Sequence, residues 1–169
     1  MLNFNEAMHL AKHLFFDDIQ QNEANQQFAL KLTSEIKSQF KIEWEKDWKN
    51  DVFLGQFYSI LWFYEERYAC YKRAYDKLVD PPATLLLLLA GCYNGQDVLP
   101  ITEEEFKSYL KKALGKKVTY EAALMMRNLC KLKGEPIQEK YWDQYYAKLV
   151  RESICAEPIV PNVLKDKNT

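Results

Sequence analysis

The stretch Tyr71–Gly95, YKRAYDKLVDPPATLLLLLAGCYNG, decides the fold because a related stretch follows 39 residues later. Moved forward by 39 residues, it lies without a gap on Leu110–Gly134, LKKALGKKVTYEAALMMRNLCKLKG, and both copies end in glycine. Small residues coincide, as Ala74 does with Ala113. A repeat of this length is typical of stacked helical hairpins, because one hairpin cannot bury its apolar face alone.

The residues around the repeat carry helix start and stop signals. Thr102 and Glu105 have the spacing of a capping box. Asp80 before two prolines is typical of a helix start, and Pro136 can open another helix. Three glycines lie where helices should end: Gly95, Gly115 and Gly134. Apolar residues recur every three to four positions and predict an all-α chain with helices over 4–18, 22–41, 51–79, 82–94, 103–116, 119–133 and 137–153.

Two motifs in the repeated part resemble the Sel1-like repeat family and, less closely, the tetratricopeptide repeats. The sequence Leu89-Ala90-x-x-Tyr93 is similar to the Leu-small-x-x-Tyr core of their first helix, and Tyr109–Leu114 is similar to the Sel1 second helix. The 39-residue period, with a loop over Gln96–Ile101, fits Sel1-like lengths better than the about 34 residues of tetratricopeptides. The resemblance covers residues 68–153 and implies an α-solenoid that binds proteins, without chemistry of its own.

The N-terminal third departs from the repeat. A shift back by 39 residues places the unbroken apolar stretch Gln56–Arg67 where a loop should lie, so we expect one long helix from Asp51 to Val79. The first two helices should pack on it. The sequence therefore predicts a single all-α domain over 1–156, built from an N-terminal helical cap (1–67) and a short α-solenoid of stacked helical hairpins (68–153), with a flexible tail (157–169).

Composition excludes several classes of function. The 169 residues carry 23 Lys+Arg and 24 Asp+Glu, a net charge of −1, whereas nucleic-acid binders usually have a large basic excess. Five glycines without a phosphate-binding fingerprint, and two histidines, leave little room for nucleotide or histidine chemistry. Residues 1–70 have a net charge of −4 and residues 71–169 one of +3, so RNA binding by the basic part stays open as an alternative.

Cysteine spacing and hydropathy indicate a cytoplasmic protein. No CxxC pair is present, so we expect reduced thiols rather than a disulfide framework or zinc site at Cys70, Cys92, Cys130 and Cys155. The first residues lack the pattern of a signal peptide. The most apolar run, 83–90, is far shorter than the about 20 residues of a membrane helix. We expect no cofactor and no membrane contact.

The leading candidate surface combines aromatic and acidic residues of the expected long helix. Tyr58, Trp62, Glu65 and Glu66, with Arg73, lie off its apolar stripe. Aromatic side chains bury a large area at low entropic cost, and such groups often dominate binding. The alternative is that the long helix is packed on both sides.

Two further groups are candidates for contact. The polar side of the helix over 119–133 carries Arg127, Asn128 and Lys131, which are contact candidates because first helices line the concave surface of hairpin repeats. A second aromatic and acidic group either binds a partner or packs as an elbow on the body: Trp44, Asp47, Trp48 and Asp51.

A different class of site is conceivable near the N-terminus. Glu6, His9, His13 and Asp17 share one helical face, and histidines four residues apart can bind a metal. The same residues also lie opposite the apolar face, where a solvated polar surface is expected.

The sequence favours a non-catalytic protein-binding module, because no GxSxG, HExxH or similar catalytic motif is present. We expect a small protein that binds one dedicated partner, either as an adaptor or as an inhibitor, the latter including immunity proteins that block a toxin or effector. The alternative is a metal- or small-ligand-binding helical protein, in one form an enzyme, that uses the Glu6/His9/His13/Asp17 face.

The repeat register makes a stability prediction. Leu89 and Ala90 should be buried, so Leu89→Ala should lower the free energy of unfolding by about 2–5 kcal/mol through the cavity it leaves. Ala90→Leu should cost about 1–3 kcal/mol by overpacking. Chemical denaturation measures both, and shifts near zero would contradict the register.

Overall fold

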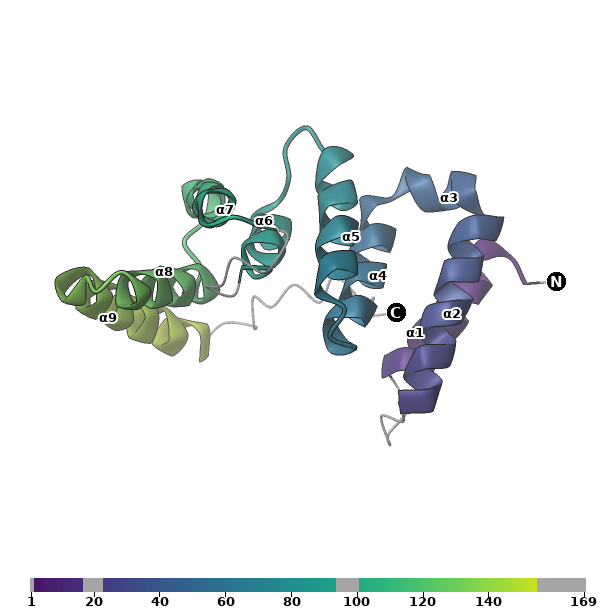
Figure 1. The fold of residues 1–169 in the computed structure, drawn as a ribbon, viewed down its shortest axis with the longest axis horizontal. Helices are drawn as coiled ribbons and strands as arrows, with labels where there is room; N and C mark the ends of the chain where they lie inside the picture. Colours follow the sequence, from purple (N-terminus) through teal and green to yellow (C-terminus); the bar gives the residue numbers. More distant parts are fainter. Residues whose placement is uncertain (1, 17–22, 94–100, 155–169) are drawn as a thin grey trace. The chain divides into compact units, whose positions relative to one another are not determined.

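The computed structural model describes residues 2–16, 23–93 and 101–154 (Figure 1). All regular structure in these residues is helical, which confirms the predicted all-α class. The chain divides into two compact units, residues 1–78 and 79–169, and consecutive helices pack as hairpins in each, as in helical-repeat folds. Gly95, most of the predicted loop 96–101 and the predicted tail 157–169 lie outside the described residues.

The first unit is built from two helical hairpins and a short connecting helix. Its helices are α1 (Phe4–Phe16), α2 (Glu23–Gln39), α3 (Lys41–Lys46), α4 (Trp48–Ile60) and α5 (Tyr64–Asp76). Helix α1 packs on α2 and α4 packs on α5, while α2 also contacts α3 and α4 (Figure 1). Phe15 of α1 stacks on Phe57 of α4, with 3.7 Å between ring centroids, so aromatic contacts join the two hairpins.

The long helix predicted over 51–79 is wrong. Helix α4 ends at Ile60 and α5 begins at Tyr64, so the segment is a hairpin. The link is a Schellman turn: the Phe63 N–H donates to the Tyr58 carbonyl at 2.9 Å, and the Trp62 N–H donates to the Ser59 carbonyl at 3.3 Å. Trp62 has a φ of 65°, a conformation that glycine usually supplies. Because no glycine or proline marks this break, the sequence pattern reads as continuous helix.

Gly55 allows α4 and α5 to pack closely. A Cβ atom at Gly55 would lie 2.5 Å from Cε1 of Tyr71 and 3.1 Å from Cβ of Cys70. Tyr71 is buried, so its ring would have to move within the packed core to make room for a Cβ atom. The smallest side chain is therefore required where the two helices cross.

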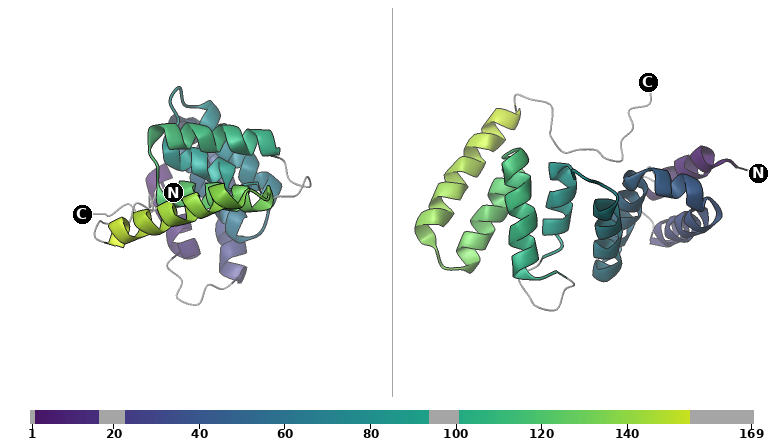
Figure 2. Two further views of the ribbon diagram at one scale, coloured as in Figure 1. Left: turned by 90° about the vertical axis from the view of Figure 1, so that its left-hand side faces the viewer. Right: turned by 90° about the horizontal axis from the view of Figure 1, so that it is seen from above.

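The second unit consists of two more hairpins. Its helices are α6 (Ala83–Ala90), α7 (Glu103–Lys116), α8 (Tyr120–Leu132) and α9 (Pro136–Ile154). Helix α6 packs on α7, α7 on α8, and α8 on α9 (Figure 2). Helices α6 to α9 therefore form a row in which each helix contacts its neighbours in sequence.

Most predicted helix signals in the second unit are confirmed. The Thr102 side chain accepts a hydrogen bond from the Glu105 N–H, and the Glu105 carboxylate accepts one from the Thr102 N–H, which completes the capping box. Gly134 has a φ of 67° after α8, and Pro136 opens α9. Gly115 lies in the last turn of α7, one residue before its end.

The N-cap role predicted for Asp80 is wrong, although the helix starts within one residue of the predicted position 82. Helix α6 begins at Ala83 with Pro82 in the N-cap position, and no side chain caps it. The Asp80 carboxylate instead forms an ion pair with Lys116 of α7. Asp80 therefore joins the segment before α6 to the end of α7.

The 39-residue register holds for second helices better than for first helices. Cys70, Tyr71 and Ala74 of α5 are buried. The residues 39 positions further along are buried in α7: Tyr109, Leu110 and Ala113. Leu89 and Ala90 of α6 are buried as predicted, but Asn128, the counterpart of Leu89, is exposed on α8. The two first helices also differ in length, with 8 residues in α6 and 13 in α8. Their buried positions therefore do not all correspond in the 39-residue register.

The close packing at Gly55 predicts opposite effects of alanine at two glycines. Gly55→Ala should lower the free energy of unfolding by about 1–3 kcal/mol, because its methyl group would collide with Tyr71. Gly115→Ala is the matched control: a Cβ there meets open space in a helix, so the change should stabilise by about 0.5–1 kcal/mol. Urea unfolding measures both, and a destabilisation at Gly115 equal to that at Gly55 would contradict this explanation.

Candidate protein-binding surfaces

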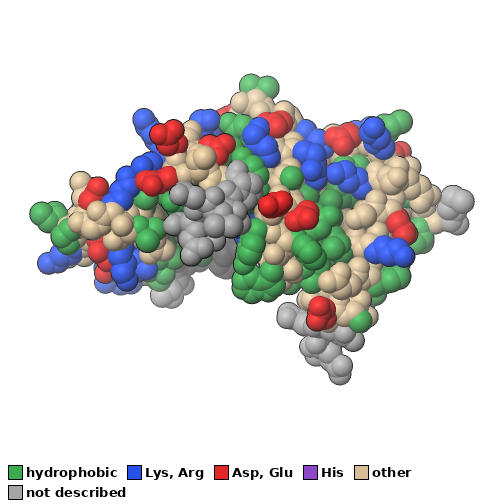
Figure 3. Space-filling view, in the orientation of Figure 1, with side chains coloured by type: hydrophobic (Ala, Val, Ile, Leu, Met, Phe, Trp, Pro, Cys, Tyr) green, Lys and Arg blue, Asp and Glu red, His purple; other side chains and the backbone are tan. Residues whose placement is uncertain are grey.

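The turn between α4 and α5 presents large apolar side chains to solvent. The exposed fractions are 45% for Ile60, 74% for Trp62 and 41% for Phe63. Glu65 and Glu66 follow in the first turn of α5 and are exposed. We call these five residues the α4–α5 surface; in Figure 3, hydrophobic side chains reach the surface near this end of the two helices. The structure thus places three predicted residues, Trp62, Glu65 and Glu66, in one turn.

The fourth predicted residue of this group, Tyr58, has a different position. Its half-buried ring packs edge-on against Phe63, with 6.1 Å between centroids. This is the apolar contact that often accompanies a Schellman turn. Burial raises the pKa of the Tyr58 phenol above its usual value, and Cys70 and Glu66 raise it further. Tyr58 therefore supports the turn from inside, beside the α4–α5 surface.

Aromatic neighbours hold the turn in its conformation. The rings of Trp62 and Tyr64 meet edge-to-face, with 6.0 Å between centroids. The guanidinium of Arg67 lies 5.2 Å from the centroid of Tyr64 and donates to the Ser59 hydroxyl at 3.4 Å. These contacts fix the base of the turn, while most of the Trp62 indole stays in solvent.

A buried carboxylate, which sequence reasoning did not single out as such, joins four helices of the first unit. Asp51 of α4 is 0% exposed. Its Oδ2 accepts from Lys77 Nζ at 2.7 Å, and its Oδ1 accepts from Trp44 Nε1 at 3.2 Å and Arg73 Nε at 3.3 Å. Lys37 Nζ of α2 lies 3.6 Å from Oδ1. These residues are far apart in the sequence and come together only through folding, so the cluster cannot be read from a local sequence pattern.

The charges around Asp51 keep it ionised. Burial raises the pKa of its carboxyl, but the hydrogen bonds from Lys77 and Trp44 and the charges of Lys77 and Lys37 outweigh burial, so the pKa lies below 3.8. Lys77 also pairs with Glu45 at 2.7 Å. The buried Asp51 carboxylate thus has hydrogen-bond donors and positive charges around it, which a buried charge requires.

Of the group Trp44, Asp47, Trp48 and Asp51, the elbow interpretation describes Trp44 and Asp51, while Trp48 is half-buried at the start of α4. Trp44 and Asp51 are buried and bonded to each other. The Asp47 side chain caps α4 by accepting from the Lys49 N–H at 2.9 Å. Arg73, once grouped with Trp62, belongs to the Asp51 cluster and also donates to Cys70 Sγ at 3.0 Å.

The described cysteines are buried free thiols. Cys70, Cys92 and Cys130 are buried, and Cys155 lies outside the described residues. Burial raises the pKa of Cys70 to about 11, although the neighbouring Arg73 and Lys37 lower it. Cys70 is therefore protonated at neutral pH.

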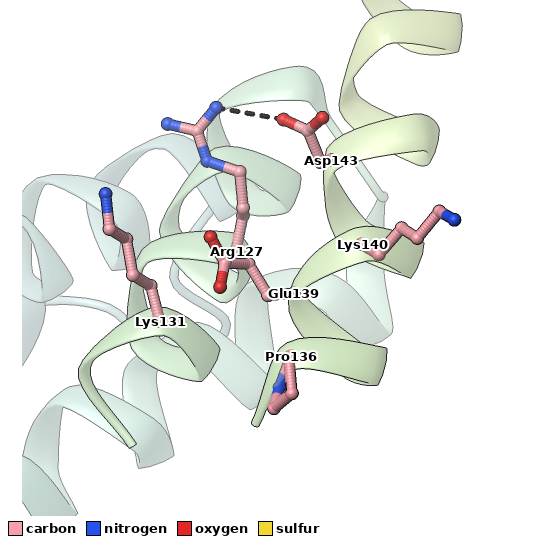
Figure 4. A pocket seen from close by; sticks show the side chains of 6 residues that line it. All are labelled: Arg127, Lys131, Pro136, Glu139, Lys140 and Asp143. Atoms are coloured by element: carbon pink, nitrogen blue, oxygen red, sulfur yellow. Dashed lines mark hydrogen bonds and ion pairs between the residues drawn. The ribbon is translucent and has the colours of Figure 1, made fainter. Parts of the chain in front are cut away.

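Two of the three remaining predicted contact residues, Arg127 and Lys131, line a groove between α8 and α9. The groove has a volume of about 400 Å³ and is lined by Arg127, Lys131, Pro136, Glu139, Lys140 and Asp143 (Figure 4). Arg127 donates to Asp143 at 3.1 Å and to Asn128 at 3.1 Å, and it lies 5.7 Å from the ring centroid of Tyr146. Arg127 and Asn128 thus help to join the hairpin, and Lys131 stands exposed at the groove.

The N-terminal polar face shows no assembled metal site in the described residues. Glu6, His9 and His13 are exposed on α1, and Asp17 lies outside the described residues. The Glu6 carboxylate accepts from the Asn3 N–H at 2.9 Å, at the start of the helix. Across residues 2–16, 23–93 and 101–154, no three His, Cys, Asp or Glu side chains lie close enough to share a metal ion.

The chain matches no protein family, no curated protein and no solved structure. Among the helices of the described segments, none has both the length and the apolar character needed to cross a bilayer.

The Asp51 cluster predicts a specific loss of stability. Asp51→Asn should lower the free energy of unfolding at pH 7 by about 2–3 kcal/mol, less than for a fully buried pair because Lys37 and Arg73 are partly solvated. Asp47→Asn is the matched control, because asparagine caps a helix as well as aspartate does.

The same substitution should also change the pH dependence. The pKa of Asp51 is lower in the folded state than in the unfolded chain, so its contribution is complete at neutral pH. It begins to be lost at about pH 5, where the unfolded chain starts to take up a proton, and falls until the folded-state carboxyl is itself protonated. The stability difference between wild type and Asp51→Asn, measured by urea unfolding, should shrink between pH 5 and the acid limit of folding. A difference that stays constant over this range would contradict the assignment.

Proposed function

We propose that this protein is a non-catalytic protein-binding module, which engages one dedicated partner through the α4–α5 surface. The observation that carries the proposal is the conformation of Trp62. An aromatic residue at positive φ is uncommon and costs about 1–2 kcal/mol. Residues held in such conformations concentrate at functional sites.

Apart from its ring contact with Tyr64, Trp62 makes few interactions with other described residues that would offset the cost of this conformation. The Schellman turn is made by backbone hydrogen bonds, which glycine at position 62 would make equally well. The α8–α9 turn has the same two bonds, from Gly134 N–H to Lys131 and from Glu135 N–H to Cys130, with glycine in the corresponding position. Trp62 is 74% exposed, so burial does not explain it either.

An exposed tryptophan held in a fixed turn is favourable for binding a partner. Tryptophan is enriched among the residues that dominate interface energies. Ile60 and Phe63 extend the apolar area around it, and the fixed turn would lower the entropic cost of binding. The groove between α8 and α9 is a second candidate for contact with a partner.

We propose two alternative roles for such a module: an adaptor, or an inhibitor that neutralises a toxin or effector. A cytoplasmic location and a Sel1-like origin of the hairpins belong to the same proposal. The product of a neighbouring gene is the first partner to test, because a toxin-like neighbour would favour inhibition and a regulator would favour an adaptor.

Trp62→Gly should separate binding from folding. Glycine relieves the strained turn, so the free energy of unfolding should be unchanged or higher by up to about 1 kcal/mol. Partner affinity should fall about 10- to 100-fold, as at an interface hot spot. Urea unfolding measures the first effect. Quantitative pull-down with micromolar bait, followed by isothermal titration with the retained protein, measures the second.

Phe28→Ala is the matched control, because Phe28 is another exposed aromatic residue of the first unit, on α2. It should leave partner capture unchanged. The proposal is abandoned if wild type retains no protein at micromolar concentration, or if Trp62→Gly retains the same partner with unchanged affinity.

A further inference from the structure

We infer that the partner segment bound by the α4–α5 surface is basic, and that an arginine or lysine side chain in it contacts Trp62 and the carboxylates of Glu65 and Glu66. This inference rests on the proposed function and adds the chemistry of the partner. It follows from the charges left unpaired at the turn and from the exposed indole beside them.

Glu65 and Glu66 are the acidic residues of the α4–α5 surface, in the first turn of α5. In the described parts of the chain, neither carboxylate forms an ion pair, and both are exposed. Elsewhere in the hairpins some carboxylates do find a cation of the fold, as Glu103 pairs with Lys107 and Lys133, and Asp143 with Arg127. Two negative charges therefore stand beside the apolar area without a counterion from the residues that the structure describes.

The indole of Trp62 suits the same partner group. Tryptophan is the best aromatic acceptor for a cation, and contact within about 6 Å of the ring stabilises a guanidinium or ammonium group. The neighbouring Arg67, the nearest cation in sequence, lies over Tyr64 and bonds to Ser59. A basic side chain from a partner would thus meet an open aromatic ring and two carboxylates, while its aliphatic stem could pack on Ile60 or Phe63.

A lipid surface is the competing occupant, because tryptophan and phenylalanine also favour membrane interfaces. The charges disfavour it: interfacial segments attract anionic lipids with Lys and Arg, whereas Glu65 and Glu66 would repel them. A basic protein segment is the better complement.

The test uses the full-length ¹⁵N-labelled protein and three matched probes followed by NMR. The first probe is the peptide Ac-GLRGLRGLRG-NH₂, and the second has each arginine replaced by glutamate. The third is a vesicle of phosphatidylcholine with phosphatidylserine. The basic peptide should shift the Trp62 indole N–H and the backbone amides of residues 60–66 in a saturable way, whereas the acidic peptide and the vesicles should not.

Charge variants assign the effect to the two carboxylates. Glu65→Gln with Glu66→Gln should weaken binding of the basic peptide about 3- to 10-fold, the effect of two exposed ion pairs. Glu43→Gln with Asp47→Asn is the matched control: it makes the same change in net charge in α3 and at the start of α4, away from the α4–α5 turn, and should leave the affinity unchanged. Thermal unfolding checks that both double variants stay folded.

Several outcomes would overturn the inference. These are equal binding of both peptides, binding of neither, shifts confined to other residues, or association with the anionic vesicles. Failure of the proposed function is distinguishable: if both peptides bind and Trp62→Gly abolishes both, the surface binds proteins without a preference for basic residues. If Trp62→Gly still captures the cellular partner, the surface itself is wrongly assigned.

Discussion

The buried carboxylate of Asp51 binds polar side chains from three other parts of the first unit. This cluster holds α4 against those three parts. Trp44 comes from α3, Arg73 from α5, Lys77 from the residue after α5, and Lys37 from α2. A buried carboxylate without partners would cost several kcal/mol, so these segments must approach together or the charge must stay in water. The apolar core tolerates alternative packings more readily than such a group does. Asp51 therefore restricts the first unit to arrangements in which α2, α3 and α5 all reach α4.

The other close constraint is the hairpin of α4 and α5. Gly55 brings the two helices together, and a link of three residues then reverses the chain. Such a short link requires a left-handed residue at its centre, and the chain places Trp62 there instead of glycine. The result is an indole fixed outside the fold by the backbone geometry of the turn. The α8–α9 hairpin solves the same geometric problem with Gly134, and its turn carries no comparable ring at that position.

Local signals made much of the fold predictable from sequence. The capping box at Thr102, the glycine at position 134 and the proline at position 136 act within one turn of their own helix ends, so they can be read without knowing the tertiary structure. The break at Trp62 carries no such signal, because its residue is unsuited to its conformation, and the hairpin was therefore predicted as one helix. Asp80 resembles a cap in sequence but pairs with Lys116, a residue 36 positions away.

The residues of the candidate site also differ in whether local sequence could predict them. Trp62, Glu65 and Glu66 are neighbours in sequence, and so their grouping survives the error in helix length. Tyr58 and Arg73 were grouped with them by helical spacing, which the break makes irrelevant, and they contact Phe63 and Asp51 instead. The ion pairs of Asp51 join residues up to 26 positions apart, and such pairings depend on the packing of helices rather than on any local pattern.

The strongest packing in the described chain is between helices that follow one another, such as α4 with α5 and α8 with α9. A chain whose contacts are mostly local closes only short loops as it folds, and proteins of this kind reach the native state within about microseconds to milliseconds. Because each hairpin needs a neighbour to bury its apolar face, folding during synthesis can proceed from the N-terminus as, in each unit, the second hairpin packs on the first. The strained turn at Trp62 would then be among the first parts of the protein to be completed as it leaves the ribosome.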